Sequence, residues 1–191
     1  VESGKYEFYA RNHNYAPYQL KLSFKQLKNM QVDVSLPYYT VINPQVEKQY
    51  LFTAQAQQSK RYNFSYQYQY LIGNPQETAP DNYAYLLPYR HGEKHRVTQG
   101  YNGSYSHQGT LALDFKMERG TPVTAAREGR VVKVKEDSNI GGASQRYNNY
   151  ANYITIYHQD GTFAKYVHLK YNGAIVTEGE RVEAGQVIGY S

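Results

Sequence analysis

The chain of 191 residues contains no cysteine and no tryptophan. Without cysteine it can form neither a disulfide framework nor a thiolate zinc site, so any metal must be held by histidine or carboxylate side chains. No segment approaches the roughly 18 consecutive apolar residues of a membrane helix, and no charged segment followed by an apolar one opens the chain. We therefore expect no membrane span and no signal peptide in this chain.

The charge is of mixed sign, with 21 lysines and arginines against 16 aspartates and glutamates and a pI near 9.1. A net charge of +5 favours an anionic polymer as a partner. Residues 1–88 carry 8 basic and 6 acidic side chains and residues 89–191 carry 13 and 10, so neither half has a clustered basic stripe. This distribution indicates a solvated mixed-charge surface and no nucleic-acid partner.

Tyrosine is the most unusual component, with 23 residues, of which 14 precede residue 90. Apolar and aromatic residues alternate with polar ones over residues 6–10, 18–24 and 64–70, which is typical of strands with one buried face. We predict an antiparallel β-sandwich over residues 1–76, with an immunoglobulin-like arrangement as one option. Core and cross-strand packing is the favoured explanation of the tyrosines, and stacking on sugar rings in a glycan-binding groove is the alternative.

A polar segment rich in proline and acidic residues, GNPQETAPDN, ends this half and predicts a linker over residues 77–88. Beyond it, residues 89–191 show short apolar strands at 129–134, 153–157 and 162–167, separated by glycine-containing turns. A G-x-x-V-x-A frame occurs twice, beginning at Gly120 and at Gly179. No segment has a sustained helical period, so we expect an all-β protein whose second domain is also antiparallel.

Three residues in this half carry the chemistry: His107 and Asp114 in SYSHQGTLALDF, and His168 in AKYVHL. A hydrolytic zinc ion needs three protein ligands and an open position for water, and His107 and Asp114 would supply two of the ligands. Positions seven apart on a regular strand point to opposite faces, so the pair can meet one metal only if a turn near Gly109 intervenes. The plainer alternative makes His107 a surface residue and Asp114 a turn cap.

These motifs, with GTPVTAAREGRVV and GERVEAGQVIGYS, occur in an order that resembles the M23 family, lysostaphin-like zinc metallopeptidases that cut peptide bonds in bacterial peptidoglycan. The resemblance extends from about residue 89 to residue 191 and implies an M23-like β domain with Zn²⁺ as its cofactor. It makes His107 and Asp114 metal ligands and His168 the catalytic residue that transfers protons and stabilises the tetrahedral intermediate. The family's His-x-His motif, which brings the last ligand, would follow residue 191, so we expect the chain as given to be inactive.

The sequence also yields expectations for the surroundings of the site. Tyr166 and His168 should share one face of a strand, and Val167 and Leu169 should share the other and reach the core. We expect His158 to be structural and residues 91–95 to form a loop at the border of a substrate groove. The polar stretch 136–149 is either a wall of that groove or an insertion without a role.

The predicted function is hydrolysis of peptide cross-bridges in peptidoglycan by a zinc endopeptidase in the periplasm or outside the cell. Its partners would be peptidoglycan or wall peptides, and the oligomeric state stays open. The alternative is an inactive M23-like module that binds or regulates wall hydrolases. A third reading is a carbohydrate-binding protein built on the tyrosine-rich half.

Overall fold

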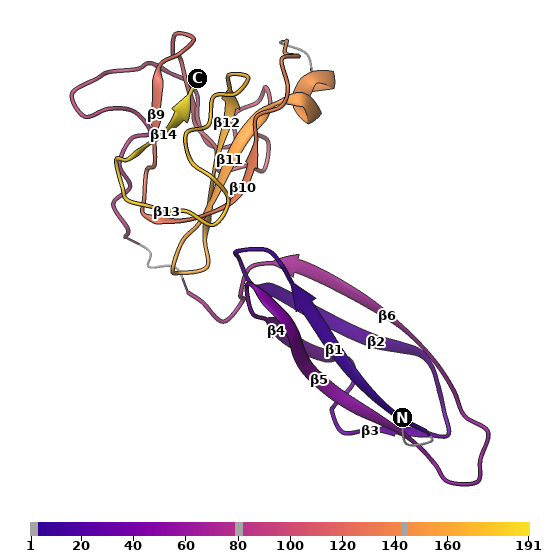
Figure 1. The fold of residues 1–191 in the computed structure, drawn as a ribbon. Helices are drawn as coiled ribbons and strands as arrows, with labels where there is room; N and C mark the ends of the chain where they lie inside the picture. The colour runs from indigo at the N-terminus through magenta and orange to yellow at the C-terminus, as the bar shows by residue number, and fades with distance from the viewer. Residues whose placement is uncertain (1–3, 79–81, 143–144) are drawn as a thin grey trace. The chain divides into compact units, whose positions relative to one another are not determined.

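The structure is a computed structural model that describes residues 4–78, 82–142 and 145–191. It divides into two compact units, the first formed by residues 1–80 with 159–162 and the second by residues 81–158 and 163–191. Both units consist of antiparallel strands, and the described residues contain one helical element, the 3₁₀ helix η1 (Gln145–Tyr150; Figure 1). The all-β, antiparallel prediction is therefore confirmed. Within the described ranges no helix is long and apolar enough to span a membrane.

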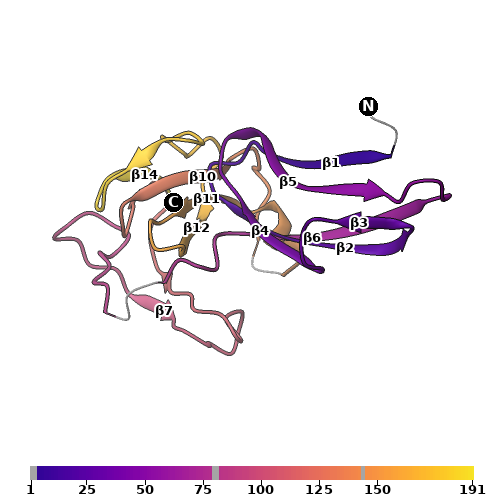
Figure 2. The same ribbon diagram turned by 90° about the horizontal axis from the view of Figure 1, so that it is seen from below.

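Unit 1 consists of two three-stranded antiparallel sheets with the strand orders β1-β5-β3 and β4-β2-β6. Strands β1 and β5 run side by side in both views (Figures 1 and 2). The strand bounds are β1 (Lys5–Asn12), β2 (Tyr18–Lys28), β3 (Met30–Val32), β4 (Tyr38–Ile42), β5 (Val46–Ala56) and β6 (Asn63–Ile72).

The core of unit 1 follows from the alternation in these strands. Leu20 and Leu22 on β2 are buried together with Leu51 and Phe52 on β5. The ring of Phe8 on β1 stacks on Phe52 with 4.5 Å between ring centroids. Burying a side chain of this size contributes roughly 1.5–3 kcal/mol, so a few such residues account for much of the stability of a small sandwich.

The tyrosines of β6 depart from the favoured packing explanation. Tyr66, Tyr68 and Tyr70 are 48%, 60% and 62% exposed, although their register partners on β2 include the buried Leu22 and Leu20. Strand β6 is an edge strand, and the facing sheet covers these side chains only in part. Alternation therefore identifies the face to which a side chain belongs, whereas the extent of its cover depends on the opposite sheet.

Unit 2 contains a four-stranded sheet of order β12-β11-β10-β13 and two strand pairs, β9 with β14 and β7 with β8. All of these pairings are antiparallel. The bounds are β7 (Val97–Gln99), β8 (Asp114–Phe115), β9 (Pro122–Thr124), β10 (Gly129–Lys135), β11 (Asn152–Tyr157), β12 (Phe163–Leu169), β13 (Arg181–Val182) and β14 (Val187–Tyr190).

The three strands expected at 129–134, 153–157 and 162–167 are confirmed as β10, β11 and β12. On β11, Ile154 and Ile156 are fully buried and alternate with partly exposed residues, as the pattern predicts. The repeated G-x-x-V-x-A frame corresponds to two turn-and-strand units. Gly120 and Gly179 adopt φ values of +89° and +93°, which favour glycine, shortly before β9 and β13 begin.

At the end of β12 the expected burial of Leu169 is confirmed, whereas the expected burial of Val167 is wrong. Tyr166 and Leu169 are the buried residues, whereas Val167 is 40% exposed and His168 is exposed. Asn152 pairs with Leu169 and Tyr153 with Val167, so His168 is the extra residue of a β-bulge. A bulge shifts the alternation by one position, which is why the two buried side chains are three positions apart and not two.

Candidate metal site

His107 lies in the loop between β7 and β8, where the chain makes successive turns. The His107 amide donates to the Gly103 carbonyl at 3.1 Å, and the Thr110 amide donates to the His107 carbonyl at 2.9 Å. Gly109 has φ +67°, a left-handed conformation that suits glycine. The predicted break in strand parity between His107 and Asp114 is thus confirmed as a turn at Gly109.

The turn brings the two predicted ligands together. The Nε2 atom of His107 lies 3.2 Å from Oδ1 of Asp114. His107 is buried at 8% exposure, whereas the Asp114 side chain keeps 43% of its surface, so the pair opens to solvent on the carboxylate side. This contact contradicts the alternative in which His107 is a surface residue.

The second ring nitrogen determines what Nε2 can do. Nδ1 of His107 lies 3.1 Å from the Gly100 carbonyl oxygen, which can only accept a hydrogen bond. Nδ1 therefore carries a proton, and Nε2 faces the Asp114 carboxylate with a lone pair in the neutral ring or with an N–H in the charged ring. Two acceptors at 3.2 Å repel one another unless a cation, either a proton or a metal ion, lies between them.

Gln99, at the end of β7, orients this pair, and the sequence reasoning missed it. Its side-chain amide donates to Oδ2 of Asp114 at 3.0 Å and to the Ser106 hydroxyl at 2.8 Å. Its side-chain oxygen accepts from the backbone amides of Tyr105 and Ser106, both at 3.2 Å. The Gln99 side chain thus holds both the loop before His107 and the Asp114 carboxylate oxygen Oδ2, which does not contact His107. The feature that could have identified Gln99 is the pairing of β7 with β8, which sets Gln99 opposite Asp114.

The geometry fits zinc. Two ligand atoms about 2.0–2.1 Å from a tetrahedral zinc ion are separated by roughly 3.3 Å, close to the 3.2 Å between Nε2 and Oδ1. A metal-bound histidine usually donates its other N–H to a carbonyl or carboxylate, as His107 does to Gly100. Across residues 4–78, 82–142 and 145–191, no three histidine or carboxylate side chains converge to hold a metal ion. His107 and Asp114 could therefore supply two ligands of a zinc site.

His168 occupies the β-bulge of β12 with φ +66°. A left-handed conformation is uncommon for residues other than glycine, and such outliers cluster at functional sites. In the described part of the chain its ring forms neither a hydrogen bond nor an ion pair, with the His107–Asp114 pair or with any other residue. The convergence of all three residues at one groove remains a prediction.

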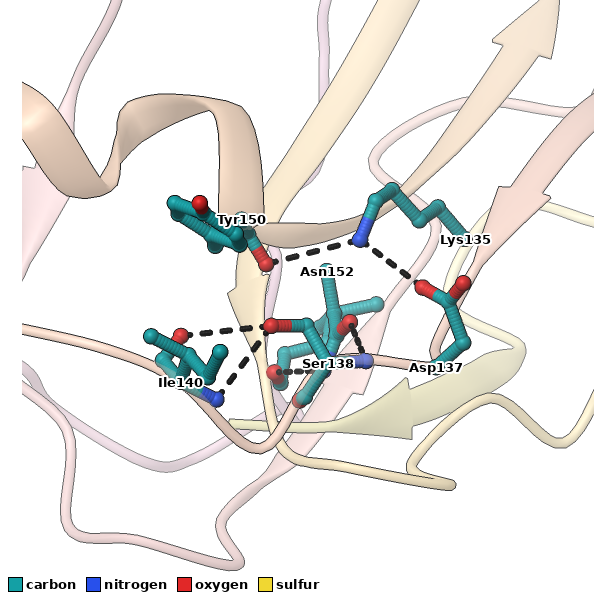
Figure 3. A network of polar contacts seen from close by, with 7 residues as sticks. Lys135, Asp137, Ser138, Ile140, Tyr150 and Asn152 are labelled. Atoms are coloured by element: carbon teal, nitrogen blue, oxygen red, sulfur yellow. Dashed lines mark hydrogen bonds and ion pairs between the residues drawn. The ribbon is translucent and has the colours of Figure 1, made fainter.

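Buried Asn152 holds the chain around this bulge and bonds to Ser138 in the loop after β10 (Figure 3). Its side-chain amide donates to the Leu169 carbonyl at 3.1 Å, next to His168, and to the Ser138 carbonyl at 2.8 Å. Its side-chain oxygen accepts from the Ser138 amide at 3.0 Å. Asn152 thus connects the end of β12 to the start of the polar loop after β10. Of that loop, Ala143 and Ser144 lie outside the described residues.

The other histidines of unit 2 have different environments. His158 is buried, with Nδ1 2.7 Å from the Glu128 carbonyl, which fits the structural role expected for it. Residues 91–95 form a loop, as predicted. In that loop the ring of His95 contacts Glu93 and the Lys116 carbonyl, each at 3.2 Å, beside a groove of about 630 Å³.

One tyrosine near the bulge is strongly perturbed. Burial raises the pKa of Tyr166 to about 12, although the hydrogen bond that its oxygen accepts from the Ala126 amide acts in the opposite direction. The Ala126 nitrogen lies 2.7 Å from that oxygen. Tyr166 is therefore a neutral core residue that ties β12 to the segment after β9.

The fold and the site together define an all-β domain with a His–Asp pair of metal-ligand geometry. Residues 105–191 match the family model described as Peptidase family M23. Glycyl-glycine endopeptidase ALE-1 from Staphylococcus capitis is 38% identical over 94 residues, which cover 48% of this chain and 22% of that protein. Lysostaphin from Staphylococcus simulans is 41% identical over 81 residues, which cover 41% of this chain and 14% of that protein.

The chain therefore carries a peptidase M23 domain at residues 105–191. It spans less than a quarter of the length of these curated relatives, at 22% and 14%. A crystal structure from Pseudomonas aeruginosa, provisionally assigned to peptidase M23, aligns over 93% of this chain and 76% of that chain, with a TM-score of 0.38 and 14% identity. A similarity that low supports no statement about a shared arrangement.

Proposed function

We propose that this protein is a zinc-dependent endopeptidase that hydrolyses peptide cross-bridges of bacterial peptidoglycan. The observation that carries the proposal is the His107–Asp114 pair, whose Nε2 and Oδ1 atoms lie 3.2 Å apart. The names of the relatives support the reaction class, since one is a glycyl-glycine endopeptidase and another is lysostaphin. A wall substrate implies that the protein works in the periplasm or outside the cell.

Each residue has a definite task in this proposal. His107 and Asp114 hold the metal, with the histidine tautomer fixed by Gly100 and the carboxylate oriented by Gln99. When bound, zinc would polarise the scissile carbonyl and generate a hydroxide nucleophile near neutral pH. We assign His168 to donating a hydrogen bond to the developing oxyanion and a proton to the leaving amine, because an imidazole exchanges protons near neutrality.

The experiment compares zinc content with the release of muropeptides from purified peptidoglycan. A protein that also carries the family's third ligand should bind zinc and release fragments, and His107→Ala in that protein should lose both. His168→Ala should keep its zinc and lose turnover by about a hundredfold or more, as expected for a proton-transfer residue. Tyr39→Ala, which changes an exposed residue on β4 of unit 1, is the control and should behave as wild type.

A second candidate function is a binding or regulatory module for other wall hydrolases. It is favoured by one observation, that the described residues converge on two ligands and no third. The same experiment separates the two functions. A protein that carries zinc and binds peptidoglycan without releasing any fragment would support the module and contradict the endopeptidase.

A further inference from the structure

The sandwich of unit 1 is open along its β6 edge. Tyr66, Tyr68 and Tyr70 pair with Phe24, Leu22 and Leu20 of β2, and paired residues of antiparallel strands share a face. The three tyrosines therefore continue the inner face of the sheet. Because they are 48–62% exposed, this face extends beyond the cover that the opposite sheet provides.

A groove of about 500 Å³ occupies the opening. The three tyrosines line one wall, residues 8–14 of β1 and the following turn line the other, and Leu20 and Leu22 contribute to the floor. The rings of Tyr68 and Tyr70 have centroids 6.3 Å apart and planes inclined by 26°. A volume of this size and an aromatic lining are typical of sites for small or chain-like ligands.

The tyrosine wall is amphipathic. The described part of the chain provides no hydrogen-bond partner for the hydroxyls of Tyr66, Tyr68 and Tyr70, so each can donate and accept toward a ligand. A pyranose ring has an apolar C–H face and a rim of hydroxyl groups. It can therefore stack on the electron-rich face of tyrosine while its rim meets the phenol hydroxyls.

The opposite wall supplies positive charge. Arg11 lines the groove, is exposed and forms no ion pair or hydrogen bond with any residue that the structure describes. The neighbouring His13 is engaged with Glu47 at 3.1 Å, and the Asn12 amide is used in contacts with Ala16 and Asn43. An unpaired guanidinium in a groove that tyrosines also line suits a carboxylate, to which arginine can donate two parallel hydrogen bonds.

We propose that this groove binds the amino-sugar strand of peptidoglycan, with sugar rings stacked on Tyr68 and Tyr70 and a sugar-borne carboxylate on Arg11. Tyrosines two apart on a strand are spaced by about 6.6–6.8 Å, so the row meets successive sugars of a chain better than a single one. The choice of polymer rests on the proposed function, whereas the binding does not need the metal site.

An extended peptide that pairs with the β6 edge is the competing occupant. The strand has no charge, glycine or proline over Asn63–Ile72, so its edge lacks the usual protection against pairing. Such a peptide would be held by backbone hydrogen bonds. It would need neither the tyrosine hydroxyls nor Arg11, which is why the lining favours the glycan.

Calorimetry on the full chain tests the proposal with two probes. One is peptide-free glycan strands that retain their lactyl carboxylates, and the other is uncharged chitin oligomers. Alanine at both Tyr68 and Tyr70 should weaken binding of both probes by about a hundredfold, since loss of one stacking ring costs roughly tenfold or more. Arg11→Gln should weaken only the carboxylate-bearing strand. Tyr39→Ala, which removes a 55% exposed tyrosine outside the groove, should change neither affinity.

Circular dichroism of each variant checks that unit 1 is folded. A second double variant, Tyr68→Phe with Tyr70→Phe, keeps both rings and is used if the alanine variant unfolds. The phenylalanine variant should retain stacking and bind at least tenfold more tightly than the alanine variant. His107→Ala, which removes the proposed metal site, should bind glycan as wild type, so the two proposals fail separately. Wild-type affinity in the folded alanine variant, or binding of an uncharged extended peptide and not of glycan, would overturn the assignment.

Discussion

The two units differ in the length and regularity of their strands. In unit 1, β2 and β5 each span 11 residues, and the sheets present continuous rows of side chains. Among the described residues of unit 2 no strand exceeds 7 residues. The candidate site residues lie where strands end or break: Gln99 and Asp114 at strand termini, His107 in a turn, and His168 in a bulge. Long strands make a repetitive surface suited to a repetitive ligand, whereas interrupted strands bring unlike side chains to one point.

The two units also differ in the hydrogen-bond partners of their polar side chains. The hydroxyls of Tyr66, Tyr68 and Tyr70 in the groove of unit 1 have no partner in the described chain. The side chains around His107, by contrast, hold one another through hydrogen bonds from Gln99 to Asp114 and Ser106. A site that must fix a metal needs such preorganisation, because ligand atoms have to be held within a few tenths of an ångström. The predictions below test whether the units differ in this way.

The largest effect is expected from Phe52→Ala in the core of unit 1. Phe52 is fully buried and stacks on Phe8, so its truncation should cost about 3–5 kcal/mol. Hydrogen exchange followed by mass spectrometry should show faster exchange in peptides of unit 1 and unchanged exchange in peptides of unit 2. Equal loss of protection in both units would mean that they unfold as one, and exposed Tyr39→Ala serves as the control.

High pH should destabilise unit 2 through Tyr166. Its pKa of about 12 exceeds the ordinary value of 10.0, so between these pH values the unfolded chain has lost a proton that the folded protein retains. Stability present below pH 10 should fall as the pH rises to 12, by roughly 3 kcal/mol. Denaturant unfolding at several pH values measures this loss in the free energy of unfolding. In Tyr166→Phe the loss between pH 10 and pH 12 should be smaller by the same amount. An unchanged loss in the variant would refute the assignment.

Asn152→Ala should loosen the His168 bulge. The change leaves the Leu169 and Ser138 carbonyls without their donor, which costs about 1–3 kcal/mol for buried groups. Turnover of peptidoglycan should fall while zinc content stays at the wild-type level, because Asn152 contacts neither proposed ligand. Asn139→Ala, an exposed asparagine in the same loop, is the matched control. Loss of zinc in Asn152→Ala would show that the bulge and the metal pair are coupled.

The smallest effect is expected for Gln99→Leu, which keeps a side chain of similar volume and removes its hydrogen bonds. Zinc affinity should fall by about tenfold, or roughly 1.4 kcal/mol, as is usual when a residue that orients a metal ligand is changed. Competition with a chromophoric chelator measures this affinity without requiring activity. Gln108→Leu, an exposed glutamine in the same loop, should leave it unchanged. Wild-type affinity in Gln99→Leu would exclude the orienting role.

Local sequence patterns predicted much of the fold and the central contact. Alternation located β10, β11 and β12, and Gly109 identified the turn that allows His107 to meet Asp114. Two features depended on non-local pairing and could not be predicted. The bulge at His168 arises from the register of β12 against β11, and histidine itself gives no sign of a left-handed φ. Gln99 became part of the site only through the pairing of two short strands.

The claim that His107 Nε2 and Asp114 Oδ1 share one zinc ion is tested most directly by a crystal structure of the zinc-loaded protein, with anomalous diffraction recorded at the zinc absorption edge. We predict one anomalous peak bonded to both atoms at about 2.0–2.2 Å, with His107 Nδ1 still donating to the Gly100 carbonyl. A peak bonded elsewhere, or no peak between these atoms at saturating zinc, would contradict the claim.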